Sequence, residues 1–146
     1  MYYKPYGNTD MMVSAVGLGT MRYNMDDVRA GRLEKCAEIP LYAFEKGINY
    51  WDTAPSYCDD KSEIITGMAL SQVDRSKVYV TSKVNFSTLE TEHPTRDMFR
   101  RRLELSLDRL QTDYIDFYHM WCICLAAAAA FSAASTRRSS SSSFCS

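Results

Sequence analysis

The amino-acid sequence predicts an α/β fold in which a short β-hairpin precedes about four parallel strands that alternate with helices. Short runs rich in β-branched and aromatic residues alternate with longer segments whose apolar residues recur at helical spacing. The segments between successive strands are long enough to contain a helix, which favours parallel pairing through right-handed crossovers. A hydrophobic fraction of 46% and a charged fraction of 24% are ordinary for a soluble globular domain.

The hairpin is predicted near the N-terminus. Residues 7–10 read Gly-Asn-Thr-Asp, a combination typical of turns. Small and apolar residues alternate over 12–19, and we expect the hairpin to lead into a first strand at 16–20.

A first helix is predicted over 26–46, followed by Gly47 at the position just past a helix end. Its apolar residues at approximately helical spacing are Leu33, Cys36, Ala37, Leu41 and Phe44. Pro40 removes one helical hydrogen bond, at a cost of about 3 kcal/mol, so we expect a kink or a late helix start there.

The middle of the chain contains a second strand, a helix and a third strand. Residues 48–52 are predicted to form the second strand, and 62–70 a helix with Ser62 as its N-cap. Residues 78–83 include several β-branched residues and are predicted to form the third strand.

A further helix and a fourth strand follow. Thr95 is expected to cap this helix, and the fourth strand is predicted at 114–121. The apolar residues predicted to form the buried stripe of the helix are Phe99, Leu103, Leu107 and Leu110.

The composition changes abruptly after Trp121. Residues 122–146 contain seven alanines and eight serines, with no acidic residue, glycine or proline. We therefore predict one α/β domain over 1–121 and a low-complexity, disordered tail over 122–146, with a short alanine-rich helix over 125–134 as the alternative. A shifted or shortened reading frame would explain such a tail.

The charge pattern and the cysteines exclude several classes of function. The formal charge is −1, from 17 basic and 18 acidic residues mixed along the chain, so no overall field attracts nucleic acid or anionic lipid. No signal-peptide core or membrane-spanning stretch is present, and a cytoplasmic location is expected. Five irregularly spaced cysteines argue against a disulfide framework, and Cys122-x-Cys124 lacks the second pair of a closed metal site. A small molecule is therefore the expected partner.

Four polar residues fall at or just past the ends of predicted strands, where parallel α/β barrels assemble their active sites: Asp52, Tyr57, Lys83 and His119. Strand parity lets Asp52 and Lys83 face the same side. A lysine there can pair with the aspartate, and its charge favours the ionised form of a nearby tyrosine hydroxyl, which makes Tyr57 a usable general acid. Taken singly, Asp52 could only cap a turn and Lys83 could be a surface charge.

Five motifs together resemble the aldo-keto reductase family, over nearly all of residues 1–121. They are G-L-G-T at 17–20, G-I-N-Y-W-D-T-A-x-x-Y at 47–57, K-S-E at 61–63, T-S-K at 81–83 and S-L-x-R-L-x-x-D-Y-I-D at 106–116. The K-S-E form and the run 110–118 look most like the bacterial branch that often carries a C-terminal ferredoxin-like iron–sulfur extension, although the cysteine cluster of that extension is not found here.

The resemblance implies the N-terminal half of a (β/α)8 TIM barrel and an NAD(P)H-dependent oxidoreductase that reduces a carbonyl to an alcohol. Hydride passes from NADPH to the carbonyl carbon while Tyr57 supplies the proton. By position, Asp52 orients Lys83 and Lys83 perturbs Tyr57. Thr20, Met21 and Asp52 are the positions implied to lie on the nicotinamide side of the cofactor.

The fourth catalytic position departs from the family pattern. The family's usual histidine lies five residues after the strand aspartate Asp116, which is Trp121 here, whereas His119 lies three residues after it. Positions 119 and 121 share a strand face, so His119 remains the candidate, one pleat deeper.

A half barrel has consequences for activity. A complete TIM barrel needs about 250 residues, and its phosphate-binding loops commonly follow strands 7 and 8. Four strands also leave two open edges, which favour self-association. We therefore expect a truncated chain that binds NADPH poorly and is inactive alone. The alternatives are a non-catalytic fragment and a binding or regulatory subunit on a reductase scaffold.

Overall fold

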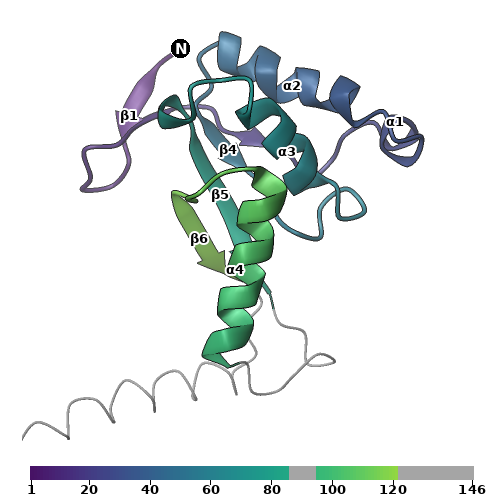
Figure 1. Cartoon of the computed structure of the whole chain (residues 1–146). Helices are drawn as coiled ribbons and strands as arrows, with labels where there is room; N and C mark the ends of the chain where they lie inside the picture. The colour runs from purple at the N-terminus through teal and green to yellow at the C-terminus, as the bar shows by residue number, and fades with distance from the viewer. Residues whose placement is uncertain (86–94, 122–146) are drawn as a thin grey trace, which may run out of the picture.

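A four-stranded parallel sheet forms the centre of the protein (Figure 1). The computed structural model describes residues 1–85 and 95–121. The sheet order follows the chain, and its strands are β3 (Leu18–Gly19), β4 (Tyr50–Asp52), β5 (Tyr79–Val84) and β6 (Phe117–Met120). Every neighbouring pair is parallel, which confirms the predicted fold class.

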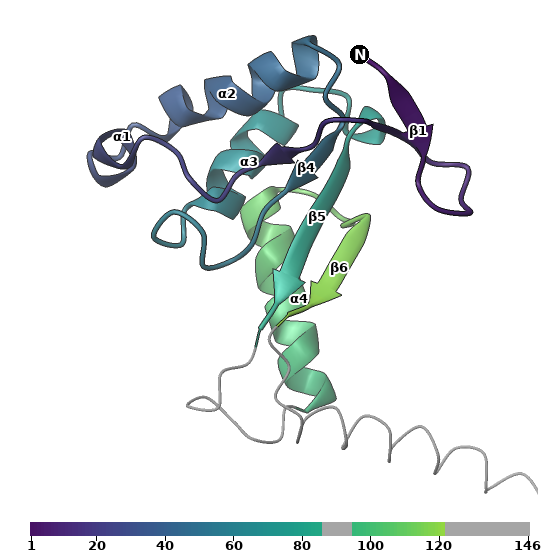
Figure 2. The same ribbon diagram turned by 180° about the vertical axis from the view of Figure 1, so that it is seen from behind.

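An antiparallel hairpin precedes the sheet, as predicted. It consists of β1 (Tyr3–Pro5) and β2 (Met12–Ser14). The hairpin lies beside the end at which β4 and β5 begin (Figure 2). The Tyr6 ring packs 4.4 Å from that of Phe117, centre to centre, and so joins the hairpin loop to the open face of the sheet.

The helices cover one face of the sheet (Figures 1 and 2). They are α2 (Leu33–Glu45), α3 (Ser62–Leu70) and α4 (Arg96–Leu110), with α3 packed against both others. The opposite face carries no helix among the described residues. None of the helices in the described part of the chain is long and apolar enough to span a membrane.

The predicted helix over 26–46 is two helices, so the single-helix prediction is wrong. Residues Met25–Arg29 form α1, and the chain turns at Gly31, with φ +73°, before α2 begins. A left-handed residue cannot continue an α-helix, and glycine adopts that conformation without steric cost. The expected late start at Pro40 is also wrong, since Pro40 lies buried inside α2.

Asp27 ties the two helices together. Its carboxylate is 2.9 Å from Lys35 Nζ and 2.6 Å from Arg32 Nη2. The hydrogen bond from Lys35, and then that from Arg32, hold the pKa of Asp27 below its ordinary value.

The stabilisation by Asp27 is therefore expected to depend on pH. A carboxyl whose folded pKa is lowered stabilises the fold above its unfolded pKa of about 3.9, and this is lost as pH falls through the folded pKa. Asp27→Asn should lower the melting temperature at about pH 7, and the difference from the parent chain should shrink at about pH 3. Circular dichroism melts at both pH values measure this, with exposed Asp26→Asn as control. An equal difference at both would contradict the prediction.

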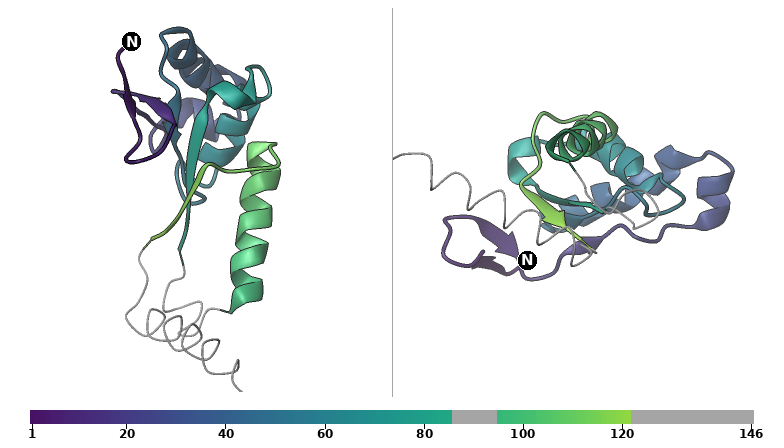
Figure 3. Two further views of the ribbon diagram at one scale, coloured as in Figure 1. Left: turned by 90° about the vertical axis from the view of Figure 1, so that its left-hand side faces the viewer. Right: turned by 90° about the horizontal axis from the view of Figure 1, so that it is seen from below.

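The ends of the later helices correct one capping prediction and confirm another. Ser62 is the first helical residue of α3 and not its N-cap, which is Lys61. Thr95 caps α4 as predicted, because its hydroxyl accepts from Met98 N. Of the predicted stripe on α4, only Leu110 is fully buried, because the N-terminal half of the helix extends past the strands (Figure 3).

The core lies between the sheet and the helices. Trp51, Ile65, Val80 and Leu110 are all fully buried there. The indole of Trp51 donates to Ile48 O at 3.0 Å, so its one polar atom is paired. Burial of an apolar side chain of this size contributes about 1.5–3 kcal/mol, and the helix-covered face of the sheet therefore provides most of the stability.

Candidate active site

The register of the sheet brings Asp52, Lys83 and His119 to the same end of the open face. Asp52 is opposite Thr81, and Lys83, two residues further along β5, is opposite His119. In a parallel sheet, paired residues point to the same face, as do residues two apart on one strand. The open face at the carboxyl ends of the strands therefore holds all three side chains.

Lys83 is held by three hydrogen bonds. Its Nζ donates to Asp52 Oδ1 at 2.8 Å, to Asp52 Oδ2 at 2.9 Å and to Thr53 O at 2.9 Å. The lysine side chain is 12% exposed and the aspartate 35%. All three ammonium protons thus have acceptors, so the charge has one defined position.

Tyr57 also lies close to this ammonium group. It follows β4 in the loop that leads to α3, and its ring centre is 4.8 Å from Lys83 Nζ. The structure therefore brings together three of the four residues singled out from the sequence, with Lys83 Nζ close to both Asp52 and Tyr57.

The loop beside Tyr57 has an unusual backbone. Cys58, Asp59 and Asp60 all have positive φ, between 51° and 62°, which is uncommon for residues other than glycine. The buried thiol of Cys58 donates to Met21 O at 3.0 Å and accepts from Tyr23 N at 3.3 Å. Burial raises the pKa of this thiol, which keeps it protonated and able to donate. Cys58 could not be singled out from the sequence, since no local pattern signals a left-handed run.

His119 and Trp121 differ in placement. His119 is exposed and lies beside Lys83 in the register of β6. Trp121 follows the end of β6, with its side chain 46% exposed and its backbone N–H bonded to Val84 O. Of the two, only His119 is the register partner of Lys83.

The three positions implied for the cofactor are not equivalent. Thr20 is buried, and its hydroxyl donates to Asp52 O at 2.8 Å. Met21 is 53% exposed. A Cβ on Gly19, the register partner of Asp52, would meet nothing within 4 Å, so there is open space beside the aspartate. Met21, Asp52 and the backbone of Gly19 present surface to a ligand, whereas the Thr20 side chain does not.

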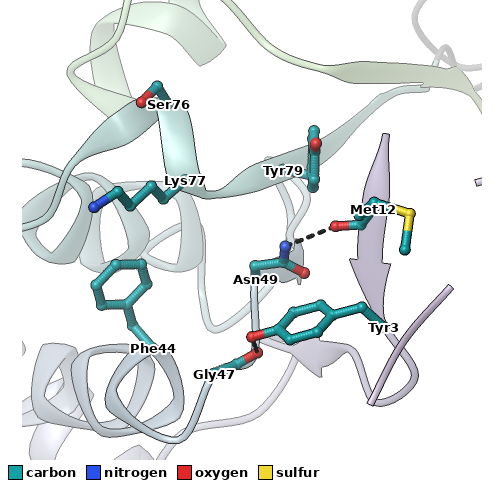
Figure 4. Close-up of a pocket in the computed structure, with 8 residues that line it drawn as sticks. All are labelled: Tyr3, Met12, Phe44, Gly47, Asn49, Ser76, Lys77 and Tyr79. Carbon is teal, nitrogen blue, oxygen red and sulfur yellow. Dashed lines mark hydrogen bonds between the residues drawn. The ribbon is translucent and has the colours of Figure 1, made fainter. Parts of the chain in front are cut away.

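A separate pocket lies at the opposite end of the strands, beside the hairpin (Figure 4). Its volume is about 440 Å³, and it contains none of the candidate catalytic residues. Its Asn49 amide donates to Met12 O at 2.9 Å, and its Tyr3 hydroxyl donates to Gly47 O at 2.9 Å. These hydrogen bonds attach the hairpin to the rest of the fold. We therefore do not place the candidate active site in this pocket.

Comparison with known proteins shows the family. A profile of the Aldo/keto reductase family matches residues 15–124. The chain is 34% identical to the NADH-specific methylglyoxal reductase of Escherichia coli K12 over 129 residues, which cover 78% of this chain and 40% of the relative.

Two solved structures are similar in both sequence and fold. The thermostable aldo-keto reductase Tm1743 bound to epalrestat superposes with a TM-score of 0.66 at 33% identity, over 81% of this chain and 42% of that one. An aldo-keto reductase from Klebsiella pneumoniae in complex with NADPH gives 0.56 at 34% identity, over 73% and 34%. The chain thus spans less than half the length of each of these three proteins. It belongs to the aldo/keto reductase family.

Proposed function

We propose that Asp52, Tyr57 and Lys83 form the proton-transfer part of an NAD(P)H-dependent carbonyl reductase site. The observation that carries this proposal is the placement of the Lys83 ammonium, bonded to Asp52 and 4.8 Å from the Tyr57 ring centre. A fixed positive charge at that point stabilises the negative charge that develops on the phenol oxygen during proton donation.

The three residues have distinct roles. Bound NADPH supplies the hydride that attacks the carbonyl carbon. Tyr57 donates its hydroxyl proton to the carbonyl oxygen as negative charge develops there, and Lys83 stabilises the tyrosinate left behind. Asp52 fixes the position of Lys83 through two hydrogen bonds. His119 is proposed to face the same substrate space from β6.

The exposed surface at the end of β3 supports a nicotinamide site. Met21 is exposed there, Asp52 is partly exposed, and Gly19 leaves room for close approach. We propose these three as the cofactor contacts of this chain, with NADPH as the cofactor and a small carbonyl compound as the substrate. The Thr20 side chain is buried, so we propose that only its backbone lies against the cofactor.

We further propose that the 146-residue chain does not turn over carbonyl substrates by itself. In TIM barrels the phosphate-binding loops commonly follow strands 7 and 8, and the described residues form four barrel strands. Hydride transfer needs reacting atoms held about 3–3.5 Å apart, which requires a firmly bound dinucleotide.

Within the described sheet, β3 and β6 are the edges, and we propose self-association there. A cytoplasmic location is proposed because the buried thiols of Cys36 and Cys58 form no disulfide.

Activity of the purified chain tests the second proposal. NADPH fluorescence would be followed during titration with the chain, and a panel of aldehydes and quinones would then be added. We expect neither saturable binding nor NADPH oxidation. Oxidation that disappears in Tyr57→Phe would show that the chain is an enzyme alone.

A chimera tests the roles of the site residues. Residues 1–121 would replace the matching segment of the Klebsiella pneumoniae reductase, and NADPH-dependent reduction would be measured. Tyr57→Phe is expected to lower kcat by about 10²–10⁴-fold, the usual contribution of a general acid. The control is Tyr42→Phe, a change of the same kind at a 60% exposed tyrosine on α2. An active chimera with an unchanged kcat in Tyr57→Phe would refute the assignment.

A further inference from the structure

Three buried hydroxyl groups lie directly behind the candidate site. Thr20 follows β3, Thr53 follows β4 and Ser62 begins α3, and each is at most 1% exposed. Ser62 Oγ is 2.7 Å from Thr20 Oγ1 and 2.8 Å from Thr53 Oγ1. The side chains of three separate elements thus meet at one hydroxyl.

The donors and acceptors of this cluster can be ordered. Thr20 Oγ1 donates to Asp52 O at 2.8 Å, and Ser62 Oγ donates to Thr20 O at 2.8 Å. The remaining proton, on Thr53 Oγ1, has Ser62 Oγ as its acceptor. Every hydroxyl proton is therefore used, which is what burial of three polar groups requires.

The cluster contacts the backbone that carries the site. Asp52 O accepts from Thr20, and Thr53 O accepts from Lys83 Nζ at 2.9 Å. These two carbonyls belong to adjacent residues, so the hydroxyls on one side and the lysine on the other act on the same short stretch of backbone. The Thr53 N–H, bonded to Thr81 O, completes its attachment to β5.

We propose that Thr53 and Ser62, together with Thr20, are positioning residues that set the orientation of the Asp52–Thr53 backbone and thereby the position of the Lys83 ammonium. The inference rests on the proposed function for its catalytic meaning. The residue type of Ser62 predicts a helix cap, but its hydroxyl instead contacts residues 42 and 9 positions away in the chain.

Thr53→Val and Thr66→Val are a matched pair for the test. Both threonines are fully buried and each loses one hydroxyl at nearly unchanged volume. The Thr66 hydroxyl donates to Ser62 O within α3, at 2.8 Å. A purely structural role would affect both variants alike, whereas positioning would affect only Thr53→Val.

The measurement is the rate of acetylation of Lys83 relative to Lys77 in the same 146-residue chain, followed by peptide mass spectrometry. Lys77 is 70% exposed and serves as the internal standard. Thr53→Val is expected to raise the ratio about fivefold, which corresponds to loss of one hydrogen bond of ordinary strength. Thr53→Ser should restore the parent ratio, and Thr66→Val should leave it unchanged at a similar loss of melting temperature.

An unchanged ratio in Thr53→Val, or an equal rise in Thr66→Val, would overturn the proposal. If Thr53→Val does not fold, Ser62→Ala takes its place with the same expected rise. The acetylation ratio is measured without catalytic turnover. A negative result there would overturn only the positioning role, whereas the Tyr57→Phe chimera tests the proposed function.

Discussion

Replacing Gly67 with alanine is expected to destabilise the chain by about 3 kcal/mol or more. Gly67 lies where α3 crosses α4, and a Cβ there would clash with Arg109 O and be 2.8 Å from the carbonyl carbon of Leu110. Both atoms belong to the helix backbone, which cannot rotate away as a side chain would. Alanine favours a helix over glycine by about 1 kcal/mol, so the clash outweighs the gain.

Urea denaturation followed by circular dichroism measures this change. Gly19→Ala is the control, because its Cβ would meet no atom within 4 Å. Since small domains have only about 5–15 kcal/mol of stability in total, Gly67→Ala should lower the urea midpoint by a large fraction. An alanine variant as stable as the parent would mean that α3 and α4 are further apart than described.

Arg75→Met is expected to have a comparable effect, about 3–5 kcal/mol, through loss of a buried ion pair. The Arg75 guanidinium is 2.8 Å from Asp116 Oδ2, and the two side chains are 16% and 11% exposed. It also donates to Thr112 Oγ1, Val78 O and Tyr114 O, and lies 4.0 Å from the Tyr114 ring centre.

The large effect follows from what the substitution leaves behind. Asp116 would keep a buried charge with one remaining hydrogen bond, from Val80 N at 2.8 Å. Arg75→Lys is expected to restore little, because an ammonium cannot reproduce the fork geometry of a guanidinium.

Lys77→Met, two residues away, is the matched control. Its ion pair with Asp74 is 3.7 Å long and exposed, so its loss should change stability by less than about 1 kcal/mol. Denaturation midpoints of the three variants distinguish these cases. Equal midpoints for Arg75→Met and Lys77→Met would show that the buried pair contributes no more than a surface pair.

The strands and the site were predictable because they follow local rules. A period of two places Asp52 and Lys83 on one face, and parallel pairing brings strand ends together, so their convergence could be inferred without coordinates. The hairpin and the Thr95 cap follow in the same way from turn and capping residues.

Other features depend on contacts between distant segments, which local patterns do not encode. The apolar residues at helical spacing begin only after Gly31, so the stretch before it joins the predicted helix without a periodic pattern of its own, and the structure has two helices there. Ser62 has the residue type of a cap, yet its hydroxyl contacts strand ends. Glu63, in the same motif, is fully buried beside Arg109 and Ser82, although a glutamate in a first helical turn usually faces water.

The alternation along β5 restricts which changes this strand can accept during evolution. Ser82 donates to Glu63 on the helix-covered face, and Lys83, one residue later, holds Asp52 on the open face. Insertion or deletion of a single residue upstream in β5 would exchange the two faces, burying the ammonium among helices and placing a serine on the open face. Substitutions can alter either face of β5 independently, whereas changes in the length of the strand disrupt both faces at once.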